Sequence, residues 1–109
     1  LRQAVEGHVL VVPRRHIADI YELDEDTAGR LMAVAVRIAK ALAADARPAG
    51  LSLWQSNGEA GGQEVLHVHL HVQPRRDNDG ILRGYRDGLP PLSDREGLDR
   101  LAERIAARL

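Results

Sequence analysis

The chain contains no cysteine and no phenylalanine, and its only aromatic side chains are two tyrosines and one tryptophan. Without cysteine it can form neither a disulfide bond nor a thiolate metal site, which is the usage expected of a cytoplasmic protein. No apolar run approaches the roughly eighteen residues that a membrane span needs. The formal net charge of −1 gives no electrostatic reason to expect nucleic acid or an anionic membrane as a partner. We therefore expect a cytoplasmic protein that binds neither.

What the chain does contain is typical of one globular domain. Its 109 residues are 44% hydrophobic and 28% charged, which suits a single modest core rather than a disordered segment. With so few aromatics, that core must be built from leucine, valine, isoleucine and alanine. The sequence begins at Leu1 rather than at a methionine. We expect residues 1–109 to form one domain.

Two helices are predicted. Asp24 is a good N-cap, and apolar residues then recur at helical spacing, so a long helix is expected to end near Ala46, before Pro48. A capping box over residues 93–96 predicts the start of a second, C-terminal helix. The apolar stripe of that second helix is Leu98, Leu101, Ala102, Ile105 and Leu109.

Three strands are predicted. Residues 8–12 form a β-branched apolar run that ends at Pro13, and residues 51–56 alternate apolar and polar side chains as a half-buried strand does. Trp54 in the second of these runs could line a binding pocket, but with so few aromatics in the chain it is expected to belong to the core. A short glycine-rich loop connects residues 51–56 to a third strand over residues 63–73, so the two are expected to be antiparallel neighbours.

Residues 63–73 also concentrate the chemistry of the chain. Three of the five histidines, His67, His69 and His71, lie there two residues apart. Because successive side chains of a strand point to opposite faces, the three imidazoles are expected to share one face. The apolar residues expected on the other face are Leu66, Val68, Leu70 and Val72. Burying polar rings without partners costs free energy, so a row of three indicates a function.

Three interpretations of the row compete. In the first, the imidazoles are ordinary surface or hydrogen-bonded strand residues. In the second they bind zinc or copper, but His67 and His71 lie on the order of 13 Å apart on a straight strand, so one ion would need two of them with His16 or Glu64. In the third a neutral imidazole attacks phosphorus, while its neighbours bind phosphate oxygens and protonate the leaving group. The third interpretation uses the whole local pattern, and we favour it.

The motif His67-Val-His69-Leu-His71-Val resembles the signature of the histidine triad (HIT) superfamily, in which His-x-His-x-His is followed by apolar residues. Residues 7–16 resemble the upstream strand of that family, which ends in a fourth histidine, here His16. Further matches flank the motif at Asn57-Gly58, Gly61-Gly62-Gln63 and Pro74-Arg75. Several separated matches in one order make the resemblance specific over residues 7–76.

The resemblance implies an α+β fold, namely a HIT-like antiparallel sheet with one long central helix and a C-terminal helix. It also implies a homodimer formed through the long helix and a strand. Val34 and Val36 lie off the main stripe of that helix, where they can widen its buried face toward a second subunit. The usual N-terminal segment of the family is expected to be missing from this chain. The implied partner is a nucleoside monophosphate-type small molecule, with no cofactor and no bound metal.

Carried over by position, the resemblance implies that His69 is the nucleophile, that His67 and His71 flank it and that His16 completes the imidazole cluster. The implied nucleotide-binding residues are Ser56, Gly62, Gln63 and Glu64. The predicted function is hydrolysis or transfer at the α-phosphate of a nucleoside phosphoramidate or related nucleotide, through a covalent nucleotidyl-histidine intermediate. The alternatives are a dinucleoside polyphosphate hydrolase or phosphorylase, and a non-catalytic nucleotide-binding module.

Overall fold

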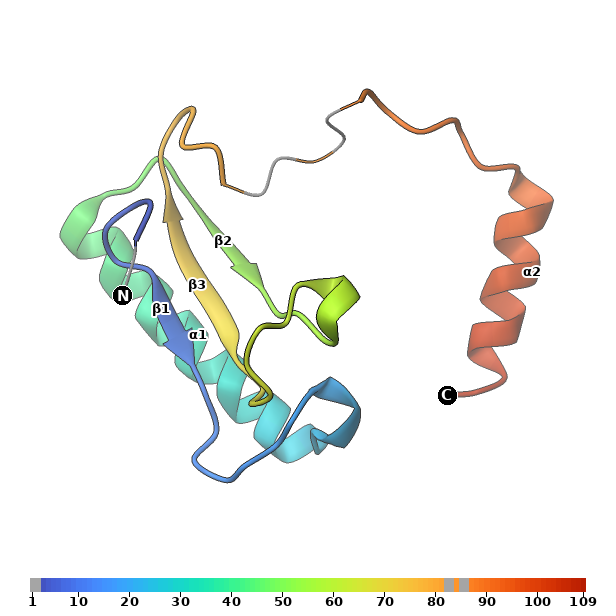
Figure 1. Cartoon of the computed structure of the whole chain (residues 1–109), viewed down its shortest axis with the longest axis horizontal. Helices are drawn as coiled ribbons and strands as arrows, with labels where there is room; N and C mark the ends of the chain where they lie inside the picture. Colours follow the sequence, from blue (N-terminus) through green and yellow to red (C-terminus); the bar gives the residue numbers. More distant parts are fainter. Residues whose placement is uncertain (1–2, 82–83, 85–86) are drawn as a thin grey trace.

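The computed structural model describes residues 3–81, 84 and 87–109. Its regular elements alternate between strands and helices along the chain, with two short 3₁₀ turns, η1 and η2 (Figure 1). In chain order they are β1 (Val9–Val11), η1 (Ile20–Glu22), α1 (Glu25–Ala46), β2 (Gly50–Trp54), η2 (Glu59–Gly61), β3 (Leu70–Arg75) and α2 (Arg95–Ala106). The predicted α+β class is confirmed.

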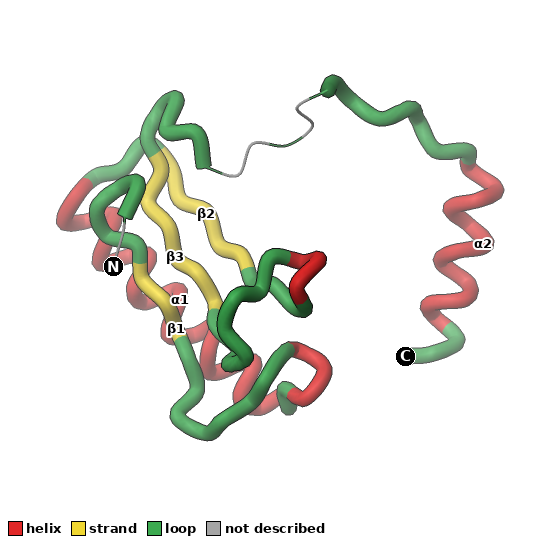
Figure 2. Tube along the Cα trace, in the orientation of Figure 1, coloured by secondary structure: helices red, strands yellow, loops and turns green. Residues whose placement is uncertain are grey.

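The three strands form one antiparallel sheet in the order β1-β3-β2, so β3 lies in the middle (Figure 2). The predicted antiparallel pairing of the second and third strands is therefore confirmed. Residues that are paired across neighbouring strands share a face of the sheet. Val72 of β3 is paired with Val9 and Leu53, whereas His71 is paired with Leu10 and Trp54. One face of the sheet thus carries apolar side chains around Val72, and the other carries Leu10, His71 and Trp54.

The core lies between the apolar face of the sheet and α1. Leu31 and Ala35 of α1 are buried against Val11 and Val72, and Ala35 and Val72 have no exposed surface. The helix begins as predicted, because the Asp24 side chain accepts a hydrogen bond from the Thr27 N–H at 2.9 Å. It also ends at Ala46 as predicted. None of the helices among the described residues combines the length and apolarity needed to cross a membrane.

The third strand is shorter than the predicted range 63–73. β3 begins at Leu70, so His67 and His69 precede the regular strand. Here the backbone turns instead, with the His67 N–H donating to the Val65 carbonyl at 2.9 Å and the Val68 N–H to the Ile17 carbonyl at 2.7 Å. Leu66 is consequently 70% exposed rather than packed on the apolar face. A strand pattern read from side chains alone does not register such backbone turns.

The C-terminal helix begins one residue later than the capping box predicted. Its N-cap is Asp94, whose side chain accepts from the Gly97 N–H at 2.7 Å, in place of Ser93. It ends at Ala106, so Leu109 lies outside it. The stripe residues Leu98, Leu101 and Ile105 are 43–52% exposed. α2 stands apart from the sheet and from α1 (Figure 1).

Candidate active site

The histidine row is held by two different kinds of structure. His71 is part of β3 and lies on the sheet face opposite the core, between Leu10 and Trp54. His67 and His69 belong to the irregular segment before β3. All three side chains are half-buried. The row is therefore continuous in sequence but is fixed by strand pairing at one end and by loop backbone at the other.

His69 has one ring nitrogen committed to the backbone. Its Nδ1 lies 2.7 Å from the carbonyl oxygen of His67. A carbonyl oxygen can only accept, so Nδ1 carries the hydrogen and donates it. In the neutral ring the lone pair is then on Nε2, the nitrogen suited to attack an electrophile. The backbone of the motif thus selects the tautomer that a nucleophilic imidazole needs.

His67 is fixed in a similar way by a more distant carbonyl. Its Nε2 lies 2.9 Å from the carbonyl oxygen of Pro13 and therefore donates to it. The ring of His16 meets that of His67 edge-on, with centroids 5.4 Å apart and planes at 68°. His16 thus contacts the first histidine of the row, and its side chain is otherwise exposed to solvent.

His8 is a site residue that sequence reasoning missed. Its Nε2 lies 2.8 Å from Nδ1 of His71, and the two rings stack with centroids 5.1 Å apart. One nitrogen of this pair donates and the other accepts. His8 stands two residues before Leu10, so it shares the face on which Leu10 lies opposite His71. The register of β1 against β3 places His8 beside the row, and this register cannot be read from the sequence alone.

Trp54 was expected in the core, and the structure places it elsewhere. It is half-buried on the opposite face, where its ring lies nearly parallel to that of His71. The ring centroids are 4.3 Å apart and the planes differ by 7°. The interpretation failed because the alternation of residues 51–56 shows which side chains share a face but not which face is covered.

His71 sits in the most perturbed environment of the row. Burial of its ring, followed by the positive charge of His69 and of His8 when protonated, lowers its pKa from 6.5 to about 4. His71 is therefore neutral at pH 7. The ring of His69 meets it edge-on at a centroid distance of 4.9 Å, so a neutral imidazole lies directly beside the ring whose Nε2 is free.

The glycine-rich loop before the row is braced by Gln63. Its buried side chain accepts from the Gly58 N–H at 2.9 Å and donates to the carbonyls of Ala18 at 2.7 Å and Val65 at 3.0 Å. Gly62 has a φ of +89°, a conformation that side chains rarely adopt, so glycine is required there by the backbone. The loop is therefore held in one shape by a side-chain amide that spans it.

The other predicted nucleotide-binding residues of this loop differ in exposure. Ser56 is half-buried beside Gly62, and the Glu64 side chain is exposed. The N–H groups of Gly62 and Gln63 donate to the carbonyls of Glu59 and Gly58 at 2.9 and 3.0 Å, so the loop itself uses these donors. These contacts fix the shape of the loop that leads into the row, and Gln63 contributes to them through its side chain.

An open pocket of about 370 Å³ lies beside the two histidines that precede β3. Its lining residues are Leu10, Val12, Val65, His67 and His69. Three aliphatic side chains thus form a wall next to the imidazole with the free Nε2. A pocket with apolar walls and a few polar groups suits a small molecule that carries a flat or apolar part and a reactive polar part.

Comparison with known proteins identifies the domain: a model of the HIT domain matches residues 2–78. This chain belongs to the HIT family. "Protein hit" of Bacillus subtilis is 34% identical over 113 residues, covering all of this chain and 75% of that protein. An adenosine 5′-monophosphoramidase of Saccharomyces cerevisiae is 31% identical, covering all of this chain and 65% of that protein. The prediction of a nucleotide hydrolase or transferase is supported at the level of the family.

Solved structures of the family share the fold. A HIT family protein from Bacillus anthracis is 35% identical and superposes with a TM-score of 0.82, covering 98% of this chain and 76% of that one. A histidine triad nucleotide-binding protein from Candida albicans is 27% identical with a TM-score of 0.81, covering 97% of this chain and 76% of that one. The arrangement of sheet and helices in this HIT domain is therefore one seen in experimental structures.

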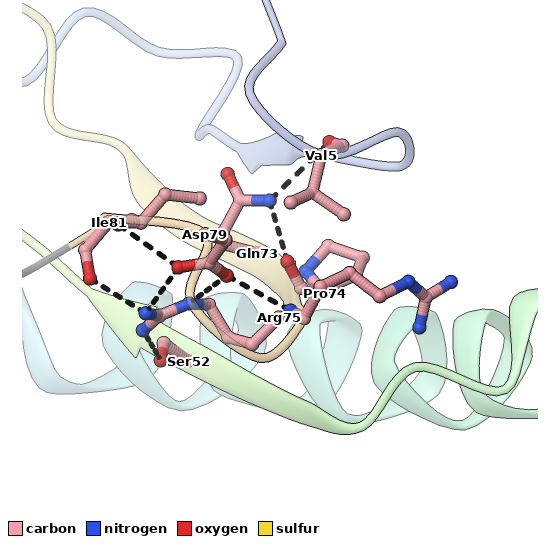
Figure 3. Close-up of polar contacts among 8 residues, drawn as sticks. Val5, Ser52, Gln73, Pro74, Arg75, Asp79 and Ile81 are labelled. Atoms are coloured by element: carbon pink, nitrogen blue, oxygen red, sulfur yellow. Dashed lines mark hydrogen bonds and ion pairs between the residues drawn. The ribbon is translucent and has the colours of Figure 1, made fainter.

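Arg75 follows the triad in this HIT domain, and its guanidinium is committed to the fold. It pairs with Asp79, with two nitrogen–oxygen distances of 2.8 Å, and donates to the Ser52 hydroxyl at 3.0 Å and the Ile81 carbonyl at 2.6 Å (Figure 3). These hydrogen bonds from Arg75 hold the pKa of Asp79 well below its usual range. Arg75 therefore fastens the turn after β3 rather than presenting a free cation to the row.

The metal interpretation of the row was also open on sequence grounds. In the part of the chain that the structure describes, no group of three or more histidine, aspartate or glutamate side chains is arranged to hold a metal ion. The partners given above for the row are instead carbonyl oxygens and other aromatic rings.

Proposed function

We propose that this HIT domain hydrolyses or transfers the nucleotidyl group of a nucleoside phosphoramidate or related nucleotide, with His69 as the nucleophile. The observation that carries the proposal is the hydrogen bond from Nδ1 of His69 to the His67 carbonyl, because it leaves Nε2 free to attack. Two relatives support the substrate class, since the proteins of S. cerevisiae and Schizosaccharomyces pombe are named adenosine 5′-monophosphoramidases at 31% and 29% identity.

The first chemical step forms a bond between Nε2 of His69 and the α-phosphorus, and breaks the bond from phosphorus to the leaving nitrogen. The leaving amine takes up a proton that the neighbouring histidines relay from solvent, and the substituted imidazole becomes cationic. The His67 carbonyl, which accepts from Nδ1, stabilises that charge. In the second step water attacks phosphorus and gives up a proton to solvent, and the bond from phosphorus to Nε2 breaks. The nucleoside monophosphate is released and His69 returns to its neutral form.

Neighbouring groups bind the phosphate and move the proton in this proposal. His67 and His71 flank the nucleophile, and His16 stands beside His67 at the rim. Because the N–H groups of Gly62 and Gln63 close the loop, we assign phosphate binding in this segment to the N–H of Glu64. The apolar wall of the pocket would receive the base, which is flat and largely apolar on its faces.

We also propose that the domain acts as a homodimer through α1. Met32 and Val36 of α1 are 47% and 43% exposed, whereas Leu31 and Ala35 beside them are buried. Val34, the other residue expected to widen the buried face of the helix, packs against the core. An apolar side of a long helix that the domain does not cover itself suits a second copy of the same helix.

Incubation with adenosine 5′-phosphoramidate tests the chemistry. We expect wild-type protein to release AMP and His69→Asn to lose this activity by about four orders of magnitude or more, because the bond-forming atom is gone. AMP binding, measured by calorimetry, is expected to persist in His69→Asn. Rapid quenching should also trap an adenylyl group on wild-type protein only. Wild-type activity in His69→Asn would refute the nucleophile, and AMP binding without release by either protein would favour the non-catalytic nucleotide-binding module.

A further inference from the structure

Trp54, the last residue of β2, makes the closest ring contact in the site. It lies opposite His71 in the register, with the two rings nearly parallel at a centroid distance of 4.3 Å. His8 completes a triangle of rings, with centroids 5.1 Å from His71 and 5.7 Å from Trp54. The tryptophan therefore covers one face of the His71 ring while His8 bonds its Nδ1.

We propose that Trp54 is a positioning residue for the reaction at His69, because its indole holds the His71 ring in place and uncharged beside the nucleophile. This role of Trp54 rests on the proposed function. The geometry supplies both effects. Face-to-face contact between the indole and the imidazole restricts rotation of the His71 side chain. The same contact removes water from one face of the imidazole, which disfavours its charged form. The indole face also attracts a cation, but the pKa of His71 is lowered, so burial is the larger effect.

A neutral His71 matters because of what happens to its neighbour. When Nε2 of His69 bonds to phosphorus, the His69 ring takes up positive charge at a centroid distance of 4.9 Å from His71. A second cation at that distance would oppose the step, whereas a neutral ring would not. Among the residues that the structure describes, the titratable groups that face His71 are His8, from the segment before β1, and His69. Trp54, from β2, and Leu10, from β1, are uncharged. Burial of the His71 ring lowers its pKa and thus favours the neutral form that the step requires.

The decisive experiment measures the titration of His71 by NMR of labelled imidazole in full-length wild type, Trp54→Phe and Trp54→Val. In Trp54→Val we expect the pKa of His71 to move from about 4 toward 6.5, since the covering ring is lost. Trp54→Phe keeps an aromatic face, so its His71 should titrate close to wild type. An identical His71 titration in wild type and Trp54→Val would overturn the proposal.

Turnover of adenosine 5′-phosphoramidate provides the second measurement. We expect kcat of Trp54→Val to fall about tenfold with KM little changed, a loss smaller than the roughly hundredfold contribution of a complete acid–base group. The acidic limb of the pH profile should move to higher pH in the same variant, and Trp54→Phe should restore both values. A tryptophan that only stabilised the fold would change the melting temperature and leave the pH profile in place.

Fluorescence gives a test that needs no substitution of Trp54. It is the only tryptophan of the chain, so its emission reports on the rings around it, of which His71 is the nearest and His8 the next. A protonated imidazole in contact with indole quenches it more strongly than a neutral one, because it accepts an electron more readily. We expect wild-type emission to drop as the pH is lowered through about 4, and that drop to vanish in His71→Asn, with circular dichroism confirming that both stay folded.

These readouts separate the two proposals. If neither wild type nor any variant releases AMP, the proposed reaction is wrong, while the NMR titration still decides whether Trp54 controls the charge of His71. If wild type turns over and the His71 titration is the same in Trp54→Val, the reaction stands and the role of Trp54 is refuted.

Discussion

The two ends of the histidine row are positioned by different means. His67 and His69 are fixed by single hydrogen bonds to backbone carbonyls, one of them only two residues away. His71 is fixed by strand register, which brings together Trp54 from one neighbouring strand and His8 from the segment before the other. Carbonyl partners select a tautomer, because they can only accept. Ring partners select a charge state, because they exclude water.

Substitution of His71 should give the largest effect among the tests of this comparison, and the effect is on kcat. We expect His71→Asn to lower kcat with adenosine 5′-phosphoramidate about a hundredfold, since a neutral imidazole can relay a proton between its two nitrogens without holding a net charge and asparagine cannot. His16→Asn is the matched control, because His16 contacts His67 at the exposed rim, and its effect should be several times smaller. Steady-state kinetics of both variants check this. Equal losses of kcat in the two variants would show that His71, the histidine held by ring contacts, has no special part in the reaction.

Removal of the loop brace should give the next largest effect, on stability. Gln63→Ala leaves the Gly58 N–H and two carbonyls without their partner. We expect the free energy of unfolding, measured with urea, to fall by about 2–3 kcal/mol. Gln55→Ala is the control, since the half-buried Gln55 amide pairs mainly with the Asn57 amide, and about 1 kcal/mol is expected. A loss no larger than that of Gln55→Ala would mean that the loop does not depend on its buried amide.

A third effect is a dependence of stability on pH. The pKa of His71 is about 4 in the folded chain and 6.5 when exposed, so between these values the unfolded chain binds more protons. Stability from this group is therefore complete above about 6.5, falls as the pH drops and is absent below about 4. Urea unfolding of wild type and His71→Asn from pH 4 to pH 7 measures it. We expect the wild-type slope to be steeper, and parallel curves would contradict the neutral state of folded His71.

Local patterns predicted the elements whose signals lie within a few residues. Asp24 as N-cap and the end of α1 at Ala46 were correct, because capping and proline effects act within one helical turn. The start of α2 was wrong by one residue, since Ser93 and Asp94 are both good caps and only the folded backbone distinguishes them. The extent of β3 was also wrong, because the turn at residues 65–67 is set by backbone hydrogen bonds that side-chain alternation does not encode.

The sequence by itself determined the family, the α+β class and the row of three histidines, since all of these follow from residue type and spacing along the chain. Only the tertiary structure decided which groups surround that row. His8 and Trp54 lie 63 and 17 positions before His71 in the chain and meet it because β1 and β2 pair with opposite edges of β3. Strand register is a long-range choice made by the burial of the apolar face, and it sets the partners on the other face at the same time.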